Sequence, residues 1–228
     1  MSLAEILNIV ATIIALIIAV VGHEIMHGLV ALKYGDDTAK NEGRLSINPI
    51  KHIDLVGTII VPALLYISNA GFIFGWAKPV PVNIRKVILN GGENGAIAVS
   101  LAGIAYNLLL ALISSILISF FNEANSLFFL LLLTQLVFIN IVLAVFNLWP
   151  IPPLDGANAL MHIASKFKFY KVVDFYQKIF PYGMIILIIV LITPIKIYFF
   201  MPIYYILILL SFLSNVDLIA LIDIVKRI

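Results

Sequence analysis

Long apolar stretches dominate this sequence, and two histidines and an acid interrupt the first of them. Of the 228 residues, 63% are hydrophobic and only 11% are charged. A soluble domain of this length could not bury so much apolar surface, so the sequence predicts a polytopic membrane protein. An ionisable side chain inside such a stretch is costly and needs a partner, which makes the interruption the strongest clue to function.

The interruption has the spacing of a zinc site. His23 and His27 lie one turn apart on the same face of a predicted helix, so both imidazoles can reach one ion. Glu24 projects beside that ion, where it can take a proton from water. The H-E-x-x-H pattern therefore predicts His23 and His27 as zinc ligands and Glu24 as the general base. The alternative is a pair of packing histidines that are satisfied by backbone or hydroxyl groups.

The apolar stretches predict an all-α fold with about five to six transmembrane helices. The predicted spans are residues 3–33, 96–121, 126–148, 182–193 and 203–222. Residues 54–73 are apolar but contain glycine and proline, so they are expected to form a short or re-entrant segment. Small insertions near the active site are predicted to be extended or to form β-hairpins. These are a strand pair within 35–49 and an extended loop or hairpin with an unpaired edge at 72–84.

Charge supports a membrane location. The net charge of +2 is too small to indicate nucleic-acid binding, and the chain has no cysteine for disulfides or thiolate ligands. Lysine and arginine residues follow the first predicted span and occur again in the region after 150, whereas the turn at 122–125 has none. The positive-inside rule then predicts a multi-pass protein of the cell membrane. Its N-terminus is expected outside, with the active-site opening and the C-terminus in the cytoplasm.

Catalytic zinc normally has a third protein ligand, and the strongest acidic candidate is Asp155. Three prolines hold the stretch 147–156 extended, and Gly156 allows a sharp turn. Irregular backbone at the end of a membrane helix needs protein or a wet cavity beside it, which an aspartate aimed at the histidines would explain. The alternative role for Asp155 is a helix N-cap. His52 and His162 lie in polar loops and are expected to be surface or structural residues.

These motifs resemble those of the site-2 proteases, intramembrane zinc metalloproteases that cut membrane-embedded substrates. The matching residues, in the family's order, are 23–27, 43–49, 52–54, 75–83, Gly103 with Asn107, and 147–156. Three of these segments, 43–49, 52–54 and 75–83, are similar to the compact subgroup that lacks a PDZ domain. The chain departs from the family pattern at Ile104, where a proline is expected after Gly103.

The resemblance implies a ligand set and a division of the chain. The ligands implied for one zinc ion per chain are His23, His27 and Asp155. Glu24 would activate water, and Asn147 and Asn107 would lie near the site, orienting the substrate or polarising its carbonyl. The whole chain, 1–228, would be a single integral-membrane metalloprotease domain. Its catalytic core would be about 3–165, and its accessory C-terminal helices about 182–222.

The predicted function is hydrolysis of peptide bonds in membrane-embedded substrate helices. The expected partners are the lipid bilayer and a membrane protein whose transmembrane segment is bound locally extended. The edge of 72–84 is the candidate for β-augmentation of that segment. The alternative is a non-catalytic zinc-binding membrane scaffold or a transporter. A transporter is expected to show half-helix repeats and acids on several spans, and a dead relative would lack Glu24, so proteolysis is favoured.

Overall fold

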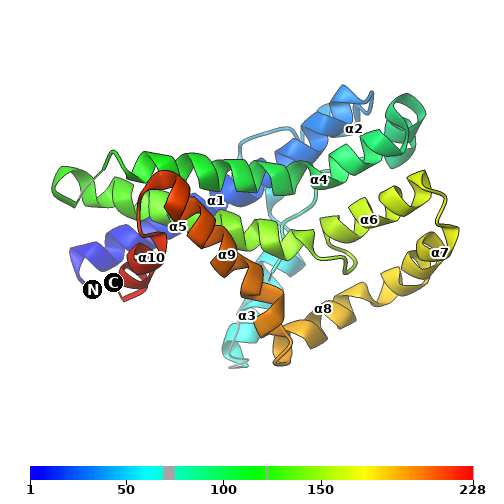
Figure 1. The fold of residues 1–228 in the computed structure, drawn as a ribbon. Helices are drawn as coiled ribbons and strands as arrows, with labels where there is room; N and C mark the ends of the chain where they lie inside the picture. Colours follow the sequence, from blue (N-terminus) through cyan, green and yellow to red (C-terminus); the bar gives the residue numbers. More distant parts are fainter. Residues whose placement is uncertain (69–74, 122, 228) are drawn as a thin grey trace.

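The protein is a bundle of α-helices, and its computed structural model describes residues 1–68, 75–121 and 123–227 (Figure 1). The helices are α1 (Leu3–Lys33), α2 (Thr38–Asn41), α3 (Val61–Ile67), α4 (Ile84–Ile118), α5 (Glu123–Leu148), α6 (Asp155–Lys166), α7 (Tyr170–Ile179), α8 (Gly183–Ile192), α9 (Lys196–Ser214) and α10 (Leu218–Arg227). Within these described residues, five stretches are long and apolar enough to cross a membrane: Leu3–Lys33, Ile84–Ile118, Leu127–Leu148, Tyr170–Ile192 and Lys196–Ser214.

Helices α1, α4 and α5 pack together and form the centre of the molecule (Figure 1). One face of α1 carries Ala11, Ala15 and Ala19, each fully buried. Small side chains at four-residue intervals let neighbouring backbones approach closely, which is how helices associate where lipid removes the hydrophobic driving force. The opposite face is exposed and carries large side chains, such as those of Ile13 and Leu16. The sequence of α1 thus turns one side to protein and the other to lipid.

The predicted β-hairpin insertions are wrong, because the described residues contain no strand. Within 35–49 the chain forms α2 and a series of turns. Residues 75–83 are irregular backbone, and 72–74 lie outside the described residues. Pro79 and Pro81 have no N–H to give to a strand partner, which prevents a regular ladder here.

The apolar segment after Asp54 is short. A π-helical stretch, Leu55–Ile60, runs into α3, and the Asp54 carboxylate accepts a hydrogen bond from the N–H of Gly57 at its start. Together these turns span about 20 Å, which is less than the hydrocarbon thickness. The N–H of Trp76 then donates to the carbonyl of Gly57 at 3.1 Å, so the chain has come back to where the segment began. The described residues therefore agree with the short segment that the sequence predicts.

Both ends of the chain lie at the same end of the bundle (Figure 1). The side-chain amide of Asn8 on α1 donates to the carbonyl of Val225 on α10 at 3.1 Å. The predicted last span, 203–222, is interrupted at Asn215, whose left-handed backbone (φ +56°) ends α9. Helix α10 then returns beside the start of α1, whereas the sequence predicts the two termini on opposite sides of the membrane.

Candidate metal centre and active site

Three potential metal ligands meet where α1 approaches the start of α6. The Oδ2 atom of Asp155 lies 3.0 Å from Nε2 of His23 and 3.3 Å from Nε2 of His27. The two Nε2 atoms are 3.1 Å apart. Within the described parts of the chain, no other group of three histidine or acidic side chains is close enough to hold one ion. The structure therefore brings together the three residues that the sequence proposed as ligands.

Asp155 is not a helix cap. It is the first residue of α6, whose N-cap is Leu154, and no side chain makes a capping hydrogen bond there. The next residue, Gly156, passes so close to the backbone carbonyl of Leu148 that a Cβ atom would collide with it. Glycine is needed at this point because the irregular stretch must fold back tightly to aim the carboxylate at α1.

In each histidine ring, Nδ1, the nitrogen that faces away from Asp155, has a fixed partner. Nδ1 of His27 lies 2.7 Å from the carbonyl oxygen of Val99, which can only accept, so Nδ1 carries the proton. Nδ1 of His23 lies 2.6 Å from Oδ1 of Asn107. The Asn107 amide nitrogen donates to the carbonyl of Ala19 and to Oδ1 of Asn140, which turns Oδ1 of Asn107 toward His23. In its neutral form each ring therefore carries its proton on Nδ1 and points the lone pair of Nε2 toward Asp155.

This arrangement fits a zinc ion. Two imidazole lone pairs and a carboxylate oxygen converge, and such groups repel one another unless a cation lies among them. The Oδ2 atom of Asp155 is buried and has no hydrogen-bond partner, which is the condition of an atom that serves as a metal ligand. Two histidines and one carboxylate are a donor set that zinc favours in catalytic sites.

Gly103 on α4 makes room for the His23 ring. A Cβ atom at this position would lie 2.5 Å from two atoms of the imidazole. The family resemblance names this glycine, and the structure explains it: Gly103 packs directly against the proposed ligand His23. Gly92 is the residue of α4 with non-helical backbone angles, so the helix continues regularly through Ile104 despite the missing proline.

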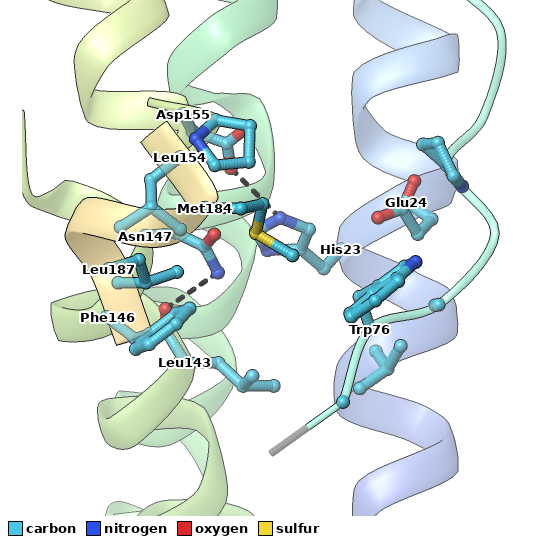
Figure 2. Close-up of a pocket in the computed structure, with 15 residues that line it drawn as sticks. His23, Glu24, Trp76, Leu143, Phe146, Asn147, Leu154, Asp155, Met184 and Leu187 are labelled. Atoms are coloured by element: carbon cyan, nitrogen blue, oxygen red, sulfur yellow. Dashed lines mark hydrogen bonds and ion pairs between the residues drawn. The ribbon is translucent and has the colours of Figure 1, made fainter. Parts of the chain in front are cut away.

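A cavity of about 360 Å³ lies beside the three ligands. Figure 2 shows His23, Glu24, Asn147 and Asp155 around it, with Glu24 between α1 and the loop that carries Trp76. Asn147 donates its amide to the carbonyl of Leu143 at 3.0 Å. The rest of the wall is mainly apolar, including Leu143, Phe146, Met184 and Leu187. The α8 residues Met184 and Leu187 were missed by sequence reasoning, because nothing in an apolar helix marks which face will close a cavity.

Asn107 does not line this cavity. Its side chain is fully buried behind His23 and forms hydrogen bonds with His23 and Ala19 of α1 and with Asn140 of α5. Asn140 of α5, which is also fully buried, supports it by accepting from its amide and donating to the carbonyl of Leu136. The link of Asn140 to the metal cluster depends on how α4 and α5 are placed, so the sequence alone could not reveal it.

The two remaining histidines lie away from the cluster. His52 is buried and its Nε2 lies 2.8 Å from the carbonyl oxygen of Ser46. His162 on α6 lies 2.8 Å from the carboxylate of Glu93. Of the predicted roles, surface or structural, both contacts support the structural one, although His162 lies within a helix and not in the polar loop expected for it.

Along residues 76–80, every second backbone N–H group is already hydrogen-bonded within the chain. This side of the segment is therefore not an unpaired strand edge. Trp76 donates to the carbonyl of Gly57, and Lys78 donates to the carbonyl of His52 at 2.9 Å. The N–H of Val80 donates to Oε2 of Glu24 at 2.8 Å. These donors are already engaged within the chain, so the predicted β-augmentation does not fit this side of the segment.

Comparisons with known proteins agree with the geometry. Residues 122–191 match the description Peptidase family M50. The chain is 36% identical over 197 residues to "Putative zinc metalloprotease YwhC" of Bacillus subtilis (strain 168), covering 83% of this chain and 84% of that protein. It is also 36% identical over 156 residues to "Putative zinc metalloprotease MJ0611" of Methanocaldococcus jannaschii, covering 68% and 72%. No solved structure matches significantly. With its five membrane-length helices, the chain is a multi-pass membrane protein that belongs to peptidase family M50, the site-2 protease family.

Proposed function

We propose that this protein is an intramembrane zinc metalloprotease that hydrolyses peptide bonds in membrane-embedded helices of other proteins. The observation that carries the proposal is the shared cavity. The carboxylate of Glu24 and the ligands His23 and Asp155 border the same space, so a base and a metal can act on one bond. A scaffold that only held zinc would need no base in this position.

His23, His27 and Asp155 are the proposed ligands of one zinc ion. When bound, zinc lowers the pKa of water toward 7 and polarises a carbonyl group. Glu24 takes the proton from the attacking water and passes it to the leaving amine. Because its Oε2 atom is occupied by the Val80 N–H, its other oxygen is assigned to this proton. Asn147 faces the cavity and is assigned to the substrate, whereas Asn107 is assigned to the orientation of His23.

The substrate is proposed to be a transmembrane segment that is bound locally extended. A peptide bond inside a helix is shielded by its own hydrogen bonds. The cavity of about 360 Å³ lies beside the proposed ligands and is available to a short extended stretch of such a segment. The apolar wall suits the side chains of such a segment. The end of the bundle formed by α2, the start of α4 and the end of α6 is called the ligand-bearing end here. We place the protein in the cell membrane with this end toward the cytoplasm, because most lysines and arginines lie near it.

The test combines zinc content with proteolysis. We expect about one zinc per chain in the purified protein, less in His23→Ala and in Asp155→Ala, and the full amount in Glu24→Gln. Reconstituted with a library of single-span membrane proteins, the parent should produce new peptide termini, read by mass spectrometry. Glu24→Gln should reduce this cleavage by about 100-fold or more.

Each result separates the alternatives. Zinc retained in Asp155→Ala would remove Asp155 from the ligand set. Full cleavage by a zinc-loaded Glu24→Gln would contradict the general base. A parent that binds zinc but yields no cleavage would favour the non-catalytic scaffold or transporter.

A further inference from the structure

Arg44 is a buried arginine with an unusual set of partners. Its side chain follows α2, and it is only 8% exposed. Among the described residues no carboxylate lies within ion-pair distance of it. Its Nη2 atom instead donates to two backbone carbonyls, those of Lys78 at 2.9 Å and Pro79 at 3.2 Å. Burying a guanidinium without a counter-charge is costly, so these two bonds need a reason beyond ordinary packing.

The Pro79 carbonyl belongs to the same peptide group as the N–H of Val80. The oxygen of this planar unit accepts from Arg44, and its N–H donates to Oε2 of Glu24 at 2.8 Å. One rigid group thus joins a buried cation to the proposed general base. A hydrogen bond to the oxygen polarises the amide and strengthens its N–H as a donor.

The local sequence leaves this peptide group little freedom. Pro79 and Pro81 flank Val80 and have no N–H of their own, so Val80 supplies the only backbone donor of the three residues. A residue before proline is also restricted to extended backbone, which applies to Lys78 and to Val80. A stiff segment transmits a displacement at one end to the other.

Arg44 is itself positioned by the turn that ends α2. Gly43 has a left-handed backbone (φ +62°), which brings the N–H of Arg44 within 2.9 Å of the carbonyl of Ala39. Only glycine takes this conformation without strain. The guanidinium is thereby directed from the end of α2 toward the segment beside Glu24.

We propose that Arg44 is a positioning residue for Glu24 and acts through the Pro79–Val80 peptide group. The proposal rests on the proposed function, because it requires Glu24 to be the base. Arg44 is not one of the proposed ligands and does not itself line the cavity, so its loss is expected to spare zinc binding and to slow proton transfer.

The experiment compares Arg44→Met, Arg44→Lys and the control Lys40→Met. Lys40 is an exposed cation on the neighbouring α2 helix, so the control makes the same kind of change without touching the segment. Using a single-span substrate that the parent cleaves, we expect Arg44→Met to keep its zinc and its KM. Its kcat should fall by about 10- to 100-fold, since a catalytic group misplaced by about 1 Å can lose about 100-fold. Arg44→Lys, which can still donate to one carbonyl, should recover part of the rate, and Lys40→Met should match the parent.

A second comparison distinguishes positioning from a general structural role. In a Glu24→Asp background the shorter side chain cannot keep the same bond to Val80, so adding Arg44→Met should cost less than about threefold in kcat. An equal loss in both backgrounds, or a loss of zinc in Arg44→Met, would overturn the positioning role. So would full activity of Arg44→Met in a parent that cleaves. A parent that binds zinc and cleaves nothing would instead refute the proposed function, and this role for Arg44 with it.

Discussion

At the scale of single residues, the site depends on the hydrogen-bond partners that hold Nδ1 of each histidine ring in place. Val99 gives His27 a backbone carbonyl, whereas His23 depends on a side chain, Asn107. A carbonyl cannot rotate away from a helix, but an amide can, so Asn107 needs its own restraints from Ala19 and Asn140. The orientation of His23 is therefore the more vulnerable of the two to substitution.

Asn107→Leu is expected to weaken zinc binding by about 10- to 100-fold, because His23 loses the partner that sets its tautomer and ring angle. The measurement is zinc competition against a chelator of known affinity. Asn8→Leu is the matched control, since Asn8 also makes an interhelical hydrogen bond, to Val225, but has no link to the metal cluster. If zinc affinity were unchanged and only cleavage fell, Asn107 would act on the substrate, as the family resemblance implied, and not on His23.

The ligands could be proposed from the sequence because their chemistry is costly in an apolar chain and their spacing is local. Two histidines four residues apart must share a helix face, and an aspartate among prolines needs a reason to be there. The role of Asn107 behind His23 could not be predicted in this way. It depends on which faces of α1, α4 and α5 meet, and an asparagine in a membrane helix bonds equally well to any neighbour.

At the scale of elements, the position of Asp155 depends on how α6 is held against α4. Helix α4 changes direction at Gly92, whose backbone is left-handed (φ +59°), and Glu93 follows this bend. The Glu93 carboxylate lies 2.8 Å from Nδ1 of His162 and accepts from the hydroxyl of Ser165 at 2.6 Å. The C-terminal half of α6 is thus fastened at the bend, and its first residue, Asp155, is aimed at α1.

Glu93→Ala is expected to lower the free energy of unfolding by about 1–3 kcal/mol, because it leaves His162 and Ser165 without their partner in a largely enclosed place. The measurement is the thermal midpoint in detergent, with zinc content recorded alongside. Glu42→Ala, which removes an exposed carboxylate from the end of α2, is the control and should leave the midpoint unchanged. Equal midpoints for both variants would show that this contact does not fasten α6.

The elements that were predicted well are those whose signal lies within one apolar run. The first helix was placed at 3–33, where α1 lies, and the run 126–148 falls within α5. The strand prediction at 72–84 rests on alternation and prolines, which are typical of an edge, whereas the N–H groups of Trp76, Lys78 and Val80 bind to Gly57, His52 and Glu24. Those partners come from distant parts of the chain, so local pattern could not reveal them.

At the scale of the whole molecule, charge supports the proposed orientation. The ligand-bearing end carries Lys86 at the start of α4, Lys166 at the end of α6, and Lys51, whose Nζ donates to the carbonyl of Gly43 beside α2. The other end, where α1 begins and α10 ends, has few basic residues (Figure 1). The positive-inside rule counts charge in loops near the spans, and it favours a cytoplasmic location for the ligand-bearing end. The contact between Asn8 and Val225 would then place residues near both termini outside.

This orientation can be tested by labelling, because the chain has no cysteine of its own. Three variants, Ser2→Cys, Arg227→Cys and Lys51→Cys, are treated in intact cells with a membrane-impermeant maleimide. Ser2→Cys and Arg227→Cys should be labelled from outside, and Lys51→Cys only after the membrane is opened. Labelling of Ser2→Cys alone would mean that α10 leaves the start of α1 in the membrane, restoring the opposite placement of the termini. Labelling of Lys51→Cys alone would invert the protein, and with it the side from which water and substrate reach Glu24.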